Sequence, residues 1–152
     1  MIAVVQRVSS ATVRVDGKIT GECKKGLMIL LGVEGGDDEK HADALAVKLS
    51  KLRIFKDEND KMNLSVLDVG GSAVVVSNFT LNADYKKGNR PNYLAGAEPA
   101  RANELYEYFS SALRLCGLHV ENGIFGAEME CTIVNDGPVT LVIDSKILVK
   151  QK

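Results

Sequence analysis

The sequence predicts a mixed α/β fold: a single domain in which barrel-like β-sheet layers carry two amphipathic helices packed outside. Three observations support this prediction, namely many short β-branched runs, two segments with helical periodicity, and a length of 152 residues. That length fits one domain with a substantial core. The expected order is four strands, a helix, two strands, a second helix and closing strands, which disfavours a simple doubly wound sheet. We therefore assign residues 1–152 to one domain.

The first strands are rich in valine and end at glycine-containing turns. Residues 2–8 and 11–15 have the composition of strands, and Asp16-Gly17 is typical of a two-residue hairpin turn leading into a strand over 18–23. Residues 26–33 are a continuous apolar run bounded by glycines. Such a run indicates a strand buried on both faces.

From Asp37 the period changes to that of an amphipathic helix, with acidic residues in its first turn and lysines near its end, as the helix dipole favours. Its apolar face comprises Ala42, Leu45, Ala46, Leu49 and Leu52. His41 lies on this helix with acidic neighbours, so we interpret it as solvated rather than catalytic.

The middle of the chain contains short strands and the second helix. Residues 53–55 predict a short strand, 56–61 a solvated turn, and 73–76 a buried strand that runs into the polar segment 77–81. Pro99 suits the first position of a helix, and Gly117 suits the position just past its end. The apolar face of this helix comprises Ala102, Leu105, Tyr106, Phe109 and Leu113.

The closing strands are predicted over 118–121, 127–134, 139–143 and 147–149. Between the second and third of them lies the turn sequence Asn135-Asp136-Gly137-Pro138. Two interpretations remain open. The turn joins its flanking strands as a hairpin, or its rigid backbone is itself a recognition surface.

Composition limits the function classes. The formal net charge of -1 provides no global positive field for nucleic acid, so any RNA contact must be local. Three widely spaced cysteines without a Cys-x-x-Cys pair argue against a disulfide framework and a zinc site, and favour a reducing, cytoplasmic setting. Neither a signal peptide nor a membrane span of ~20 apolar residues is evident.

Known catalytic motifs are absent, including phosphate-binding loops, dinucleotide-binding fingerprints, metalloprotease helices and nucleophile elbows. His41 and His119 are the only histidines, so no obvious base is available. The segment 77–81 could form an oxyanion-type pocket at a strand end, although its hydroxyls could equally cap the turn that follows. The loop 85–93 combines three basic residues with two aromatic ones, which suits phosphates and a stacked base, or only a polar loop.

Several ordered blocks along the whole chain match one known family. They are Val4-Val5-Gln6-Arg7-Val8, Gly26-Leu27, Leu52-Arg53-Ile54-Phe55, Lys61-Met62-Asn63-Leu64-Ser65, Val76-Ser77-Asn78-Phe79-Thr80-Leu81, Gly88-Asn89-Arg90-Pro91, Phe125-Gly126-Ala127-Glu128-Met129 and Asn135-Asp136-Gly137-Pro138-Val139-Thr140. Together these blocks resemble the D-aminoacyl-tRNA deacylase family, formerly called D-tyrosyl-tRNA deacylases. Asn78 stands where the family usually has glutamine, so the amide is kept on a shorter side chain.

The resemblance implies a homodimer that hydrolyses the ester of D-aminoacyl-tRNA, and of glycyl-tRNA mischarged on tRNA(Ala). We expect no cofactor and assign no metal ligands. The resemblance further implies that Gly137-Pro138 has a cis bond and reaches across the dimer interface into the partner's pocket. An L side chain would collide with this fixed backbone, whereas a D side chain points away. The alternative is a non-catalytic RNA- or ligand-binding module of the same fold.

The resemblance also implies roles for individual residues. Ser77, Asn78, Phe79 and Thr80 match the segment around the scissile ester. Phe125, Ala127 and Met129 match the pocket lining, and Arg7 matches the residue that orients the Gly-Pro turn. Their structural alternatives are core packing and a surface ion pair. Charge alone suggests phosphate contacts by Lys86, Lys87 and Arg90.

Thr80 has no neighbouring base in the sequence that could activate its hydroxyl. We therefore favour a mechanism in which the ribose 2′-hydroxyl of the tRNA positions or activates the attacking water.

Overall fold

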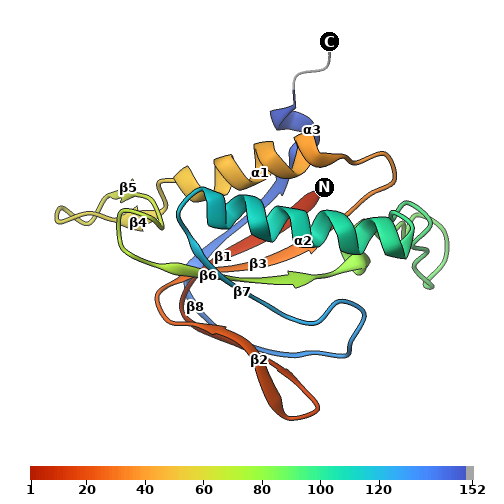
Figure 1. Cartoon of the computed structure of the whole chain (residues 1–152), viewed down its shortest axis with the longest axis horizontal. Coiled ribbons are helices and arrows are strands. Elements are labelled where there is room, and N and C mark those ends of the chain that lie inside the picture. The colour runs from red at the N-terminus through yellow and green to blue at the C-terminus, as the bar shows by residue number, and fades with distance from the viewer. Residues whose placement is uncertain (150–152) are drawn as a thin grey trace.

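A computed structural model, which describes residues 1–149, shows a six-stranded sheet that curls into a nearly closed barrel (Figure 1). The strand order is β2-β1-β3-β6-β7, and β8 pairs with β1. The strands of this sheet are β1 (Ile2–Val15), β2 (Lys18–Cys23), β3 (Gly26–Gly32), β6 (Ser72–Ser77), β7 (His119–Asn122) and β8 (Glu130–Asp144). The predicted mixed α/β fold is confirmed.

A separate hairpin and four helical segments complete the fold over residues 1–149. The hairpin of β4 (Phe55–Lys56) and β5 (Met62–Leu64) projects from one end of the molecule (Figure 1). The helices are α1 (Glu39–Lys51), α2 (Pro99–Leu115), α3 (Ser145–Leu148) and the 3-10 turn η1 (Phe79–Asn82). None of the helices within residues 1–149 is long and apolar enough to cross a bilayer.

Strand β1 organises the barrel because it pairs with three other strands. Its first half pairs with β3, its second half with β2, and both halves with β8. The prediction of two strands over 2–8 and 11–15 is therefore wrong. The register shift between Val8 and Ser10 bends β1 without breaking it, and the bend moves its buried side chains from one hydrophobic core to another.

The barrel nearly closes where β2 meets β7. A Cβ atom on Gly21 of β2 would lie 2.7 Å from the carbonyl oxygen of Asn122 on β7, so only glycine permits this approach. The backbone N–H of Glu22 also donates to the carboxylate of Glu121, at 3.3 Å.

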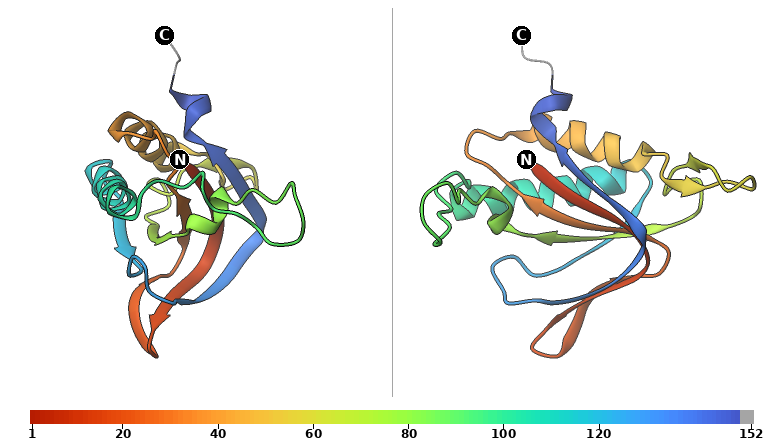
Figure 2. Two further views of the ribbon diagram at one scale, coloured as in Figure 1. Left: turned by 90° about the vertical axis from the view of Figure 1, so that its right-hand side faces the viewer. Right: turned by 180° about the vertical axis from the view of Figure 1, so that it is seen from behind.

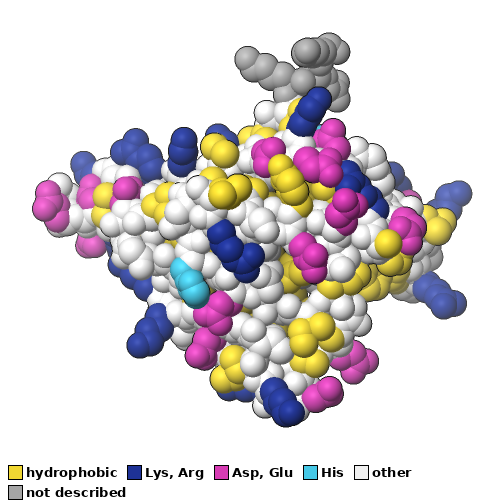
Figure 3. All heavy atoms as spheres, in the orientation of Figure 1, with side chains coloured by type: hydrophobic (Ala, Val, Ile, Leu, Met, Phe, Trp, Pro, Cys, Tyr) yellow, Lys and Arg dark blue, Asp and Glu magenta, His cyan; other side chains and the backbone are white. Residues whose placement is uncertain are grey.

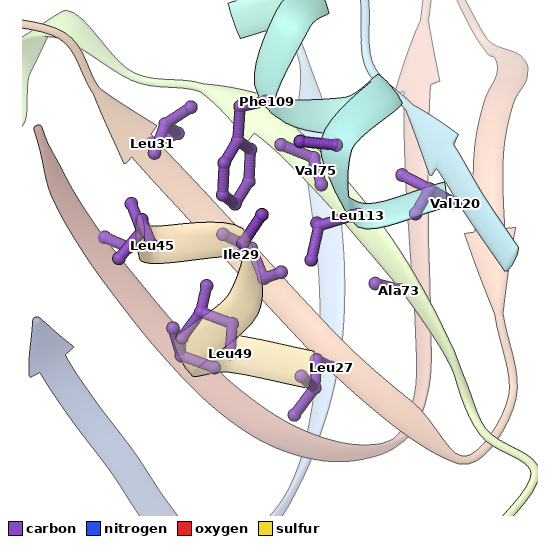
Figure 4. Close-up of a cluster of buried hydrophobic side chains, with 14 of the residues drawn as sticks. Leu27, Ile29, Leu31, Leu45, Leu49, Ala73, Val75, Phe109, Leu113 and Val120 are labelled. Atoms are coloured by element: carbon purple, nitrogen blue, oxygen red, sulfur yellow. The ribbon is translucent and has the colours of Figure 1, made fainter. Parts of the chain in front are cut away.

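Helices α1 and α2 lie side by side over one face of the sheet (Figures 1 and 2). Both predicted helices are confirmed, with Pro99 in the first turn of α2 and Gly117 at a positive φ just beyond it. Side chains from both helices point onto β3 and β6 (Figure 4). The buried cluster includes Leu27, Ile29, Leu31, Leu45, Leu49, Val75, Phe109 and Leu113.

His41 is not a solvated residue, contrary to the interpretation above. Asp38, the N-cap of α1, accepts a hydrogen bond from the His41 backbone, and the His41 ring contacts the Asp38 backbone N–H in return. This reciprocal capping satisfies amides that a helix start leaves free. The His41 contact also lowers the pKa of the Asp38 carboxyl group.

Three further predictions at strand level need correction. The expected strand over 53–55 is reduced to Phe55–Lys56, because Arg53 and Ile54 precede the hairpin without pairing in it. The expected strand over 147–149 is replaced by α3, whose first turn is capped by the Asp144 side chain. The two strands expected on either side of the Gly-Pro turn are one strand, β8, described below.

A buried ion pair joins the amino group of Met1 to the loop before α1. The amino nitrogen lies 2.7 Å from Asp37 Oδ2 and donates to Ser145 Oγ at 2.7 Å, and the Asp37 side chain is 1% exposed. Asp37→Ala should lower the free energy of unfolding by about 3–5 kcal/mol, because it leaves a buried charge without its main partner. Denaturant titration measures the change. Asp43→Ala on the exposed face of α1 should cost less than about 1 kcal/mol, and equal losses would contradict this account.

Candidate active site

An open cavity of about 750 Å³ lies between the end of β6, the start of α2 and the loop joining β7 to β8. Figure 3 shows hydrophobic side chains exposed on the face between α2 and this loop. The lining is mostly apolar, as is usual for small-molecule sites. It comprises Leu30, Val33, Val76, Ser77, Asn78, Phe79, Tyr93, Gly96, Ala97, Pro99, Ala102, Phe125, Gly126, Ala127, Met129, Cys131 and Ile133.

The polar segment after β6 forms the rim of this cavity. Ser77, Asn78 and Phe79 line it, whereas Thr80 is exposed and lies outside the lining. The backbone N–H groups of Phe79 and Thr80 donate to no group within residues 1–149, because they start the turn η1. Of the two residues, Phe79 belongs to the cavity lining and Thr80 directly follows it. The capping alternative is not supported, because η1 has no side-chain cap.

The side-chain amide of Asn78 forms a hydrogen bond with Thr80. Its Oδ1 accepts a hydrogen bond from the Thr80 hydroxyl, at 2.5 Å. An amide oxygen is a very weak base, so this contact fixes the hydroxyl without activating it as a nucleophile.

Phe125, Ala127 and Met129 form the opposite wall and are half-buried rather than part of the closed core. The Phe125 ring packs against Tyr106 of α2, with centroids 6.1 Å apart. The Tyr106 hydroxyl donates to the carbonyl oxygen of Val75, two residues before Ser77. Burial raises the pKa of Tyr106, which keeps this donor protonated.

The cavity lining contains no carboxylate, imidazole or amine. Cys131 is present, but burial raises its pKa and so disfavours the thiolate. His119 lies outside the cavity, exposed and 3.1 Å from the Glu121 carboxylate. Within residues 1–149 no group of acidic, histidine or cysteine side chains could hold a metal ion. The polar groups that line this site are therefore mainly amides and hydroxyls.

Several lining residues were missed by sequence reasoning. Cys131 and Ile133 follow the strand alternation after Met129, and this period could have identified them. Tyr93 belongs to the loop 85–93, for which the sequence suggested base stacking, but no period in that loop places the residue in this cavity. Its ring meets Phe79 edge to face at the rim, with centroids 5.1 Å apart.

The Gly-Pro segment is neither a hairpin turn nor part of this cavity. Gln6 of β1 pairs with Thr140, and Val8 pairs with Asn135, so residues 136–139 bulge out of one continuous strand β8. The hairpin interpretation is wrong because both arms pair with β1 instead of with each other (Figure 2). The Gly137-Pro138 bond is cis, as the resemblance implies, and both residues are exposed.

Arg7 holds this bulge, which comprises residues 136–139, from beneath. Its guanidinium group is buried, and its Nε atom lies 3.1 Å from both the carbonyl and a carboxylate oxygen of Asp136. Its Nη1 donates to the carbonyl oxygen of Ile54, at 2.7 Å. Arg7 thereby links the bulge to the chain entering the β4–β5 hairpin, and it is not a surface ion pair.

The basic loop borders the cavity. Asp84 and Asn92 close its base through two backbone hydrogen bonds of 2.7 and 2.9 Å. Lys86, Lys87 and Arg90 are all exposed between them. Figure 3 shows Lys and Arg side chains at the edge of the molecule where this loop lies.

Comparisons with known proteins give one consistent result. The family model described as D-Tyr-tRNA(Tyr) deacylase matches residues 4–144. A protein of Koribacter versatilis named D-aminoacyl-tRNA deacylase is 56% identical over 146 residues, covering 96% of this chain and 98% of the relative. A protein of the same name from Thermus aquaticus is 52% identical over 145 residues, covering 95% of each.

Solved structures agree with the fold. A structure titled c-Myc DNA Unwinding Element Binding Protein is 36% identical, with a TM-score of 0.88, and the match covers 95% of this chain and 98% of that chain. A probable eukaryotic D-amino acid tRNA deacylase shares the fold at 14% identity, with a TM-score of 0.79 over 93% and 97% of the two chains. The chain therefore belongs to the D-Tyr-tRNA(Tyr) deacylase family.

Proposed function

We propose that this protein hydrolyses the ester of D-aminoacyl-tRNA, and of glycyl-tRNA mischarged on tRNA(Ala), and rejects L-aminoacyl-tRNA through the Gly137-Pro138 backbone. The shared name of the relatives supports the reaction class. The cavity supports the substrate class, because an apolar space with the free backbone amide of Phe79 at its rim, and that of Thr80 next to it, suits an aminoacyl ester.

In this mechanism the amides of Phe79 and Thr80 hold the carbonyl oxygen and the negative charge that develops on it. Ser77 and Asn78 supply the polar rim, while Phe125, Ala127 and Met129 enclose the amino-acid side. The cavity lacks a protein base, so we assign activation of water to the ribose 2′-hydroxyl. We assign no cofactor to these steps.

The observation that carries the proposal is the separation of cavity and bulge within one chain. The cavity lining contains no residue of 135–140. Gly137 and Pro138, at the tip of the bulge, are exposed on the surface of their own chain. We infer a homodimer in which the bulge of one subunit enters the cavity of its partner. The bulge carbonyls then occupy the place of an L side chain, whereas a D side chain or glycine avoids them.

A heterodimer with two separable affinity tags tests this arrangement. One subunit carries Ala127→Trp, which fills its cavity, and the other carries Pro138→Gly, which loosens its bulge. The open cavity then faces the intact bulge of its partner. We expect the purified heterodimer to hydrolyse only D-aminoacyl-tRNA, while the Pro138→Gly homodimer also accepts the L form. Equal L activity per open cavity in the two dimers would show that the bulge acts within its own chain.

We assign tRNA phosphate contacts to Lys86, Lys87 and Arg90, whose loop reaches the cavity rim at Tyr93. Replacing all three by glutamate should raise the Kd for tRNA at least about tenfold and flatten its salt dependence. The D-over-L preference should stay unchanged, because the loop does not touch the amino acid. Filter binding at several salt concentrations measures the first effect. The same triple change at Lys18, Lys24 and Lys25 is the control, and an equal effect there would contradict the assignment.

The cytoplasmic setting expected from the cysteines agrees with this function, since tRNA charging takes place there. Cys23, Cys116 and Cys131 are all unpaired. Burial raises the pKa of Cys23 to about 11.

A further inference from the structure

The side chain of Asn135 ties the base of the bulge together. Its Nδ2 group donates hydrogen bonds to the carbonyl oxygen of Val139, at 3.2 Å, and to that of Arg7, at 3.0 Å. The first bond joins the two ends of the bulge, and the second attaches them to β1. One half-buried amide therefore fixes the loop to the strand that carries it.

The absence of a side chain at Gly137 leaves space for the Asn135 amide. The φ of Gly137 lies outside the left-handed region, so the backbone conformation alone does not require glycine. A Cβ atom at position 137 would instead overlap Asn135 Oδ1 and lie 2.9 Å from Asn135 Cγ. The amide cannot move away without giving up its two hydrogen bonds. Gly137 thus makes room for Asn135.

The Asn135 contacts are distinct from those of the Arg7 guanidinium. Arg7 holds Asp136 through its side chain, whereas Asn135 holds Val139 and the Arg7 main chain. The two residues at the tip, Gly137 and Pro138, lie between these attachments and make neither of them. Their position therefore depends on both.

We propose that Asn135 is a positioning residue that sets the D-over-L specificity by holding the Gly137-Pro138 backbone in place. Asn135 acts through the bulge and does not touch the substrate. This inference rests on the proposed function of the bulge as a chiral filter. It adds a residue that determines specificity, and it gives the physical reason for glycine at position 137.

Asn135→Asp tests the role with almost no change in shape. A carboxylate oxygen replaces the donor and faces two carbonyl oxygens, so both hydrogen bonds are lost. The ratio of kcat/KM for L-aminoacyl-tRNA to that for the D form should rise by roughly tenfold to a hundredfold, the factor that two neutral hydrogen bonds contribute. A merely structural role would lower both rates together and leave the ratio unchanged.

Asn59→Asp on the exposed β4–β5 loop makes the same change of charge and should leave the ratio at the wild-type value. Asn135→Ala provides a second removal of the donor in case Asn135→Asp does not fold. Dimer mass and thermal unfolding confirm that each variant is intact. A folded, dimeric Asn135 variant with the wild-type ratio would overturn the proposal.

A double-mutant cycle tests the coupling to Gly137. Gly137→Ala should raise the L-to-D ratio in the wild-type background, where the new Cβ strikes Asn135. In the Asn135→Ala background the nearest remaining atom is the Val139 nitrogen, at 3.4 Å, which is an ordinary contact. The same substitution should then add less than about twofold.

Equal multiplicative effects of Gly137→Ala in the two backgrounds would overturn the coupling. Failure of the proposed function gives a different result, because the wild-type protein would then hydrolyse D and L substrates alike, or neither of them, before any substitution is made.

Discussion

Hydrolysis of a D-aminoacyl-tRNA that lacks the ribose 2′-hydroxyl on its terminal adenosine should be at least about a hundredfold slower than hydrolysis of the normal substrate. General acid–base assistance is typically worth 10²–10⁴-fold, and the cavity contains no carboxylate, imidazole or amine that could replace it. Single-turnover release of the amino acid, with enzyme in excess, measures the chemical step directly.

Thr80→Ala is the matched comparison for this substrate change. The Thr80 hydroxyl donates to the Asn78 amide oxygen and lies outside the cavity lining. Its loss should slow hydrolysis by less than about tenfold, because one neutral hydrogen bond is removed. A larger effect from Thr80→Ala than from the deoxy substrate would contradict substrate assistance and assign the nucleophile to Thr80.

Arg7→Ala should reduce the D-over-L ratio of kcat/KM at least about tenfold and lower the free energy of unfolding by about 2–4 kcal/mol. The substitution removes three contacts of a buried guanidinium group, to Ile54 and twice to Asp136, and leaves the Ile54 carbonyl without this donor. Hydrogen bonds to charged groups are worth about 1.5–3 kcal/mol each. Denaturant titration and competing D and L substrates measure the two effects.

Two variants separate the role of Arg7 from a general effect of charge. Arg7→Lys keeps the charge but not the forked donor geometry, so it should recover part of the stability and little of the ratio. Arg14→Ala changes the same strand outside the bulge and should leave the ratio unchanged. A folded Arg7→Ala variant with the full D-over-L preference would show that the bulge is positioned without this side chain.

Local patterns predicted the helices well. The apolar faces of α1 and α2 show the helical period directly in the sequence. Pro99 and Gly117 mark the two ends of α2 through local backbone preferences. The capping role of His41 is also local, but histidine seldom takes that role. Sequence reasoning therefore placed it on the surface.

Predictions about β8 failed because pairing is a property of the whole fold. The segments on either side of Gly137-Pro138 have the composition of hairpin arms, and nothing in them shows that β1 is long enough to pair with both. The resemblance to a known family indicated a recognition role for this turn, but the bulge and the Asn135 contacts became visible only in three dimensions.

The candidate site was also predicted only in part. The sequence predicted the polar segment that starts at Ser77, because it directly follows an apolar strand. The lining residues Tyr93 and Ala97 come from an irregular loop with no period to follow. The separation of cavity and bulge could not be read from order along the chain, since it depends on how β8 passes β1.

D-selective hydrolysis is tested by incubating the wild-type protein with matched D-, L- and glycyl-tRNA and measuring release of free amino acid. We expect release from the D and glycyl esters and none above the uncatalysed rate from the L ester. Release of L at a rate similar to D would contradict the backbone filter. No release from any substrate would favour a binding module that keeps the fold without turnover.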